Sequence, residues 1–83
     1  MQLQKTIEFT PYLASAYAEG FCEGADATIE EQMLAWSYLI STKLAYQLQG
    51  WYGRTAQHLI RMEMIDAEGN ISWDNVYEAI NNQ

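Results

Sequence analysis

The residues whose types could do chemistry are few and widely spaced in this chain. His58 is the only histidine and Cys22 the only cysteine, so the usual metal sites built from several such ligands are excluded. A nucleophilic thiolate needs a nearby base or cation to stabilise its charge, whereas the sequence neighbours of Cys22 include Glu19 and Glu23. We therefore predict no metal, no cofactor and no catalytic cysteine, and we expect Cys22 to be a buried structural thiol.

Two acidic clusters also invite a chemical interpretation. One combines oxygen ligands of the type that calcium prefers, but it lacks the twelve-residue spacing with glycine sixth and glutamate twelfth; its members are Glu63, Asp66, Glu68 and Asn70. The other, Glu30 and Glu31, suits the start of a helix, whose dipole it complements. The sequence shows no convergent nucleophile, base and oxyanion donors, and we predict that the protein is not an enzyme.

Two glycines bracket two large aromatic residues in the run from Gln47 to Ala56, where Gly50 and Gly53 flank Trp51 and Tyr52. Glycine costs about 0.5 to 1 kcal/mol relative to alanine inside a helix, so the pair indicates a close backbone approach or a break in the helix. It is not a phosphate-binding loop, because the required lysine followed by serine or threonine is absent. Either another helix approaches the glycines while the aromatic rings fill the core, or the segment is a surface platform.

The platform interpretation rests on residue type and on charge. Trp, Tyr and Arg are enriched among the residues that dominate binding energies, and the sequence has no acidic residue from Gln32 to Met62. Arg54 in this acid-free stretch is therefore either paired with an acid from elsewhere in the chain or offered to a partner. The predicted protein-binding residues are Gly50, Trp51, Tyr52, Gly53 and Arg54.

We predict the helices that position these residues from helix-capping residues and from the spacing of apolar residues along the sequence. Thr10 and Pro11 predict a helix start, after a short extended lead over residues 6–9, and the helix is expected to end around Gly24 to Asp26. Its expected buried face comprises Tyr12, Leu13, Ala16, Tyr17, Gly20 and Phe21.

Thr28 and Glu31 form a capping box that predicts the start of a second helix. We expect this helix to bury Ile29, Met33, Trp36 and Ile40 and to fade near Ser41, with a turn up to Lys43.

A third apolar stripe predicts a helix over most of residues 43–61, with its continuity at Gly50 left open; the stripe comprises Leu44, Leu48, Trp51, Tyr52, Thr55 and Leu59. Asp66 to Asn70 is predicted to be a turn, and Ser72 to cap a last helix from Trp73 to about Ile80. Residues 70–72 are also able to pair with the lead around Ile7 and Phe9. The sequence thus predicts one all-α domain over residues 1–83, a small bundle of three to four helices.

The amino-acid composition limits the classes of partner that the protein can bind. The chain of 83 residues is 49% hydrophobic and 13% aromatic, which is too apolar for a disordered segment. Its formal charge of −7 disfavours direct binding to nucleic acid or to anionic membranes. We find no apolar run of the roughly 20 residues that span a membrane and no apolar core of a secretory signal after the opening residues. These features and the single cysteine predict a cytoplasmic protein.

The run from Trp36 to Ile60, centred on Gln-Gly-Trp-Tyr-Gly-Arg-Thr-Ala at residues 49–56, resembles small proteins encoded by tailed bacteriophages, a family with no established activity. The resemblance covers about a third of the chain. It implies expression in the cytoplasm of an infected bacterium and a role in redirecting host machinery or blunting host defence, and it assigns no catalytic residue.

Two hypotheses follow from the sequence. The first is a protein-binding module, a phage-encoded modulator or inhibitor that engages a host or phage protein through Trp51 and Arg54. The second is an acidic decoy that imitates nucleic acid and occupies a basic groove. Exposed aromatic residues on so small a domain also suit a symmetric homodimer.

Overall fold

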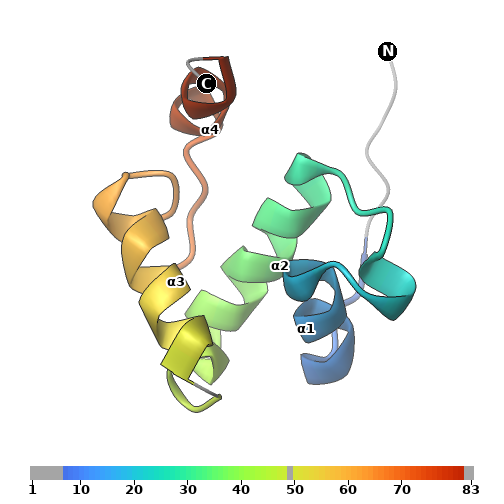
Figure 1. Cartoon of the computed structure of the whole chain (residues 1–83). Helices are drawn as coiled ribbons and strands as arrows, with labels where there is room; N and C mark the ends of the chain where they lie inside the picture. Colours follow the sequence, from blue (N-terminus) through green and yellow to red (C-terminus); the bar gives the residue numbers. More distant parts are fainter. Residues whose placement is uncertain (1–6, 49, 82–83) are drawn as a thin grey trace.

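The computed structural model describes residues 7–48 and 50–81, and these residues form a small all-α fold, as predicted (Figure 1). The described elements are α1 (Pro11–Glu19), the 3-10 helix η1 (Cys22–Gly24), α2 (Ile29–Ser41), the 3-10 helix η2 (Leu44–Tyr46), α3 (Gly50–Arg61) and α4 (Trp73–Asn81). The predicted start of the lead at Thr6 and the junction at Gln49 lie outside the described residues.

Helix α1 begins where its cap predicts and ends earlier than expected. The backbone amide of Leu13 donates to Thr10 Oγ1 at 3.1 Å, with Pro11 in the first turn. The helix ends at Glu19 because Gly20 adopts a left-handed φ of 77°, which glycine reaches without strain. The predicted end around Gly24 to Asp26 is therefore wrong, and that region holds η1 instead.

The buried residues of α1 are small rather than aromatic: Ala14 and Ala18 on the side of the core, and Ala16 on the side of Gly24. Tyr12, expected in the core, is 54% exposed, and Phe21 is exposed beside it with the two ring centroids 6.4 Å apart. The predicted face is confirmed at Ala16 and in part at Tyr17, which packs on the core, but it is wrong for Tyr12 and Phe21. Small alanines let α1 lie close to its neighbours and leave these two rings outside.

Helix α2 is held at its start by the predicted capping box. The Glu31 amide donates to Thr28 Oγ1 at 3.1 Å, and the Thr28 amide donates to Glu31 Oε1 at 2.9 Å. The helix ends at Ser41 as expected, and Lys43, with a left-handed φ of 67°, reverses the chain.

In the described part of the chain, α2 lies between α1 on one side and α3 on the other (Figure 1). It therefore buries more than the single predicted stripe. Met33, Trp36 and Ile40 are buried as predicted, whereas Ile29 is exposed, and Leu39 and Ala35 are fully buried in addition.

The third predicted helix is divided. Residues 44–46 form η2, and α3 begins at Gly50. The reversal at Lys43 directs the chain into a separate short turn, and Leu48, expected on the buried stripe, is exposed. Within α3 the predicted apolar stripe is confirmed at Tyr52, which is buried, and at Leu59, which packs on the core.

The connection from α3 to α4 folds back on itself. Asp66 to Asn70 forms the predicted turn, and Ile65 pairs with Ile71 in an isolated antiparallel bridge. The suggested pairing of residues 70–72 with Ile7 and Phe9 is therefore wrong, because this segment pairs within its own loop. The Asn75 amide donates to Ser72 Oγ at 3.4 Å, which confirms Ser72 as the cap of α4.

Tyrosine hydroxyls connect several elements through glutamate carboxylates. Tyr12 donates to Glu23 at 3.1 Å, Tyr77 of α4 donates to Glu30 of α2 at 3.0 Å, and Tyr52 of α3 donates to Glu19 of α1. The bond to Glu30 raises the pKa of Tyr77, and hydrogen bonds from its own backbone amide and from Tyr77 lower the pKa of Glu30. These bonds therefore depend on a neutral phenol and an ionised carboxyl.

We expect the stabilising effect of the Tyr77–Glu30 bond to vary with pH at both ends of the scale. Because the folded pKa of Glu30 lies below its ordinary 4.5, its contribution is present above that pH and is lost as the pH falls through the lowered value. Because the folded pKa of Tyr77 lies above its ordinary 10.0, its contribution is present below that pH and is lost as the pH rises through the raised value.

The measurement compares urea unfolding of the wild type and of Tyr77→Phe across the pH range. The self-repulsion of the acidic chain is common to the two proteins, so their difference in unfolding free energy isolates this bond. The difference is expected to be constant near neutrality and to shrink in acid and in alkali. A difference that stays the same well below the ordinary pKa of Glu30 would contradict the assignment.

Candidate functional site

The surface predicted from the sequence lies on α3, whose two sides differ sharply. Tyr52 and Ala56 are buried against the core, whereas Arg54, Gln57 and Arg61 are exposed. Successive residues of this set are three and four positions apart, so all three lie along one face of the helix. Arg61 in the last turn also complements the negative end of the helix dipole.

Trp51 is the exposed aromatic residue of this surface. Its side chain is 42% exposed, and its ring centroid lies 5.8 Å from that of Trp36 and 5.0 Å from that of Tyr52. Packing on two rings holds one side of the indole, so its open edge is presented in a fixed position. A large apolar surface that is already ordered loses little entropy on binding.

Tyr52 belongs to the core and not to this surface. It is only 6% exposed, packs against Trp36 at 6.0 Å and donates its hydroxyl to Glu19. Burial, together with the bond to Glu19, raises its pKa and keeps the phenol neutral. Its ring is thus not available to a partner, and its role is to position Trp51 and to join α3 to α1.

An open groove of about 600 Å³ runs beside α3. It is lined by Tyr46, Gly50, Gly53, Arg54, Gln57 and Arg61. Tyr46 comes from η2 and is 42% exposed, so the groove joins the 3-10 turn to the outer face of the helix. Of the five predicted residues, three line this groove, namely Gly50, Gly53 and Arg54, and Trp51 directly follows Gly50 in the sequence.

Gly50 and Gly53 make no close approach to the backbone of another element, so the first sequence-based explanation is wrong; the second, a break in the predicted helix, holds at Gly50, where α3 begins. A Cβ built on Gly53 would lie 3.8 Å from the carbonyl oxygen of Ala45, an ordinary contact, and one built on Gly50 would lie 2.9 Å from Nη1 of the Arg54 side chain. The close approaches are elsewhere. A Cβ on Gly24 would lie 2.3 Å from the carbonyl oxygen of Ala16, and one on Gly69 would lie 2.9 Å from that of Ser37.

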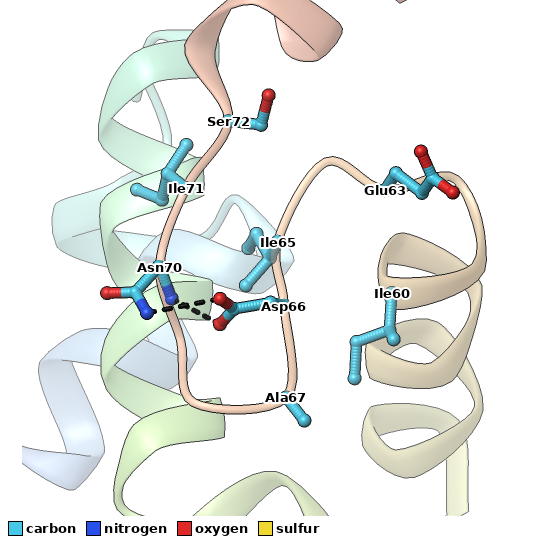
Figure 2. A pocket seen from close by; sticks show the side chains of 8 residues that line it. All are labelled: Ile60, Glu63, Ile65, Asp66, Ala67, Asn70, Ile71 and Ser72. Atoms are coloured by element: carbon cyan, nitrogen blue, oxygen red, sulfur yellow. Dashed lines mark hydrogen bonds between the residues drawn. The ribbon is translucent and has the colours of Figure 1, made fainter.

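A second hollow, of about 310 Å³, lies between the end of α3 and the loop before α4 (Figure 2). Isoleucine side chains and the polar groups of the loop line it. The carboxylate of Asp66 accepts from the backbone and side-chain amides of Asn70 at 2.9 and 3.1 Å, and these bonds lower its pKa. The Asp66 carboxylate and the Asn70 amides, joined by dashed lines in Figure 2, thus already stabilise the turn, which makes this hollow the weaker candidate for recognition.

Other chemistry is sparse in the part of the chain that the structure describes. Within residues 7–48 and 50–81, no group of three or more His, Cys, Asp or Glu side chains is placed to hold a metal ion. Cys22 was expected to be buried, but it is exposed on η1, where Gly24 is the buried residue. His58 is exposed on α3. No helix in the described residues is long and apolar enough to cross a membrane.

Sequence reasoning missed three of the groove residues: Tyr46, Gln57 and Arg61. The spacing of Arg54, Gln57 and Arg61 along a predicted helix was a signal that could have found two of them. Tyr46 had no such signal, because its place beside α3 depends on the reversal at Lys43.

Comparison with known proteins assigns the chain to a protein family. No curated protein and no solved structure matches the chain. A family model described as "Domain of unknown function (DUF7417)" matches residues 22–80, which include α2, α3 and the groove between η2 and α3. The match covers more than half of the chain, and the chain therefore belongs to the DUF7417 family.

Proposed function

We propose that this protein is a non-enzymatic binding module that engages a protein partner through the outer surface of α3. In this proposal it acts in the cytoplasm of an infected bacterial cell, as a phage-encoded modulator or inhibitor of a host protein, or as a partner of another phage protein. The surface comprises Trp51, Arg54, Gly50 and Gly53.

The observation that carries the proposal is the half-exposed Trp51 held next to an exposed arginine. Tryptophan and arginine are the types that most often dominate an interface, and such residues bind best when their free conformation is already fixed. Trp51 is supported by Trp36 and Tyr52, and Arg54 lines the adjacent groove. A surface of this kind favours recognition of a folded partner over a reaction, which would need positioned acid, base and nucleophile groups.

We expect Trp51→Ala to reduce partner recovery strongly. A residue at the centre of an interface contributes about 2 kcal/mol or more, which is about a 30-fold change in Kd. The tagged protein and the variant would be purified from lysate of infected host cells, and the partners quantified by mass spectrometry. The matched control is Tyr12→Ala, which removes an exposed aromatic residue from α1 and should leave recovery unchanged.

Two other outcomes separate the alternatives. Equal recovery by Trp51→Ala and by the wild type, with binding that disappears at about 1 M salt, would favour the acidic decoy, because the Debye length is then about 3 Å. Sedimentation that detects a stable dimer, disrupted by Trp51→Ala, would identify a second copy as the partner of this surface. Circular dichroism of each variant would establish that it is folded.

A further inference from the structure

The groove beside α3 concentrates positive charge in a strongly acidic protein. Arg54 and Arg61 both line it, while the chain as a whole carries a formal charge of −7. No acidic residue occurs in the sequence from Gln32 to Met62, so α3 itself supplies no carboxylate to these arginines. The groove therefore suits a partner that brings negative charge to this one face and is repelled by the others.

The spacing of the arginines indicates what shape that partner has. Seven residues on an α-helix correspond to about two turns, or about 10.5 Å along the axis. Two carboxylates seven residues apart on a second helix repeat that distance. On a strand, residues of one face lie about 6.6 or 13 Å apart, which matches less well. An acidic helix lying along α3 therefore fits the two guanidinium groups best.

The glycines of the groove fit a close helical approach. An added Cβ at Gly53 would meet only the carbonyl oxygen of Ala45 at ordinary contact distance, so folding requires no glycine there. Distances between packed helices depend on the side chains at the contact, and they are shortest where side chains are small. Gly53 lies one residue before Arg54 and lines the same groove.

Two further groups complete the groove. Gln57 lies between the arginines on the same face, and its side-chain amide can both donate and accept a hydrogen bond. Tyr46, half exposed on η2, adds an aromatic surface with a hydroxyl. Both suit a polar peptide surface at the rim of a contact.

We propose that the α3 groove binds an acidic α-helical segment of a partner protein. Arg54 and Arg61 each form paired hydrogen bonds to a carboxylate, the two carboxylates being seven residues apart, and the backbone of the segment passes over Gly53. This inference rests on the proposed function and names the chemistry of the partner at the same surface.

The test uses a defined probe, a fluorescein-labelled alanine-rich peptide of about 20 residues, long enough to form a helix, with two glutamates seven residues apart. A twin peptide carries glutamine at both positions. Fluorescence anisotropy at low salt should show that the wild type prefers the glutamate peptide by about tenfold. The double variant Arg54→Gln, Arg61→Gln should lose this preference, whereas Lys43→Gln, which removes an exposed cation outside the groove, should keep it.

Gly53→Ala provides a second measurement that does not change any charge. Replacing glycine inside a helix should raise the melting temperature by about 2 to 8 °C. The added methyl group should nevertheless weaken binding of the glutamate peptide by at least about fivefold, because it occupies the path of the peptide backbone. A more stable protein that binds less well distinguishes a contact with the peptide from a purely structural role.

Three results would overturn the inference. The first is equal binding of the two peptides in titrations that reach a dissociation constant of about 1 mM. The second is an equal loss of preference in Lys43→Gln and in the double arginine variant. The third is tighter binding of a short thymidine oligonucleotide than of the glutamate peptide. If any of these results occurred while Trp51→Ala still abolished partner recovery, an acidic helix would be excluded as the ligand, and the proposal of a protein-binding surface on α3 would be retained.

Discussion

Trp36→Ala should destabilise the protein by about 3 to 5 kcal/mol, the usual cost of removing a buried tryptophan. Trp36 is almost fully buried on α2, and its ring contacts those of Trp51 and Tyr52 on α3. A chain of 83 residues has a total stability of about 4 to 12 kcal/mol. The loss is therefore a large fraction of the whole, and much of the variant should be unfolded at moderate urea concentration.

Urea unfolding followed by far-ultraviolet circular dichroism measures this effect. Trp51→Ala is the control, because it removes the same side chain from a half-exposed position and should cost mainly the aromatic contact, about 0.5 to 1.5 kcal/mol. Similar losses in the two variants would show that Trp36 does not support α3 in the way described. A large loss confined to Trp36→Ala would also show that Trp51 can be removed for binding experiments without loss of the fold.

Gly24→Ala should be the most disruptive single-methyl change in the described chain. The new Cβ would lie 2.3 Å from the carbonyl oxygen of Ala16 and 2.5 Å from the Cα of Tyr17. Both are backbone atoms of α1, so relief requires η1 to move away from the helix. Overpacking of this kind costs about 1 to 3 kcal/mol and sometimes more.

The matched experiment is the same substitution at Gly53, where the new Cβ fits. Gly53→Ala should stabilise the protein by about 0.5 to 1 kcal/mol, because alanine favours the helix and meets no close neighbour. Equilibrium unfolding of the two variants should therefore give changes of opposite sign. Changes of the same sign would contradict the packing of η1 on α1 or the open position of Gly53.

The helix starts were predictable because their determinants are local. Thr10, Thr28 and Ser72 each bond a backbone amide three residues ahead, so the cap and its partner are read from the same short stretch of sequence. The helix ends were less predictable. The end of α1 follows from the left-handed conformation of Gly20, and the third predicted helix is divided between η2 and Gly50, where its continuity had been left open.

Burial was harder to predict than helicity. Tyr12 and Tyr52 both occur at helical spacing among apolar residues, yet the first is exposed and the second lies in the core. The difference comes from contacts with distant elements, since the Tyr52 ring packs on Trp36 of α2 and its hydroxyl donates to Glu19 of α1. For the same reason the sequence pointed to Gly50 and Gly53 as sites of close approach, whereas Gly24 meets a backbone that is adjacent only in the folded molecule.

The candidate surface was predictable in part. The acid-free stretch and the neighbouring Trp51 and Arg54 are visible in the sequence, and the structure places Trp51 half exposed and Arg54 in a groove. The groove itself needed the fold, because Tyr46 enters it from η2 after the reversal at Lys43.

The bonds between tyrosines and glutamates have a consequence for how ionic strength acts on this molecule. Each of these bonds joins an uncharged phenol to a carboxylate and is not an ion pair. Salt screens the attraction between opposite charges, so it should weaken these bonds little. Added salt also screens the mutual repulsion of a chain with a charge of −7, which favours its compact state. At high salt concentration, the proposed acidic ligand should thus dissociate from the arginines, whereas the stability of the folded protein should stay the same or increase.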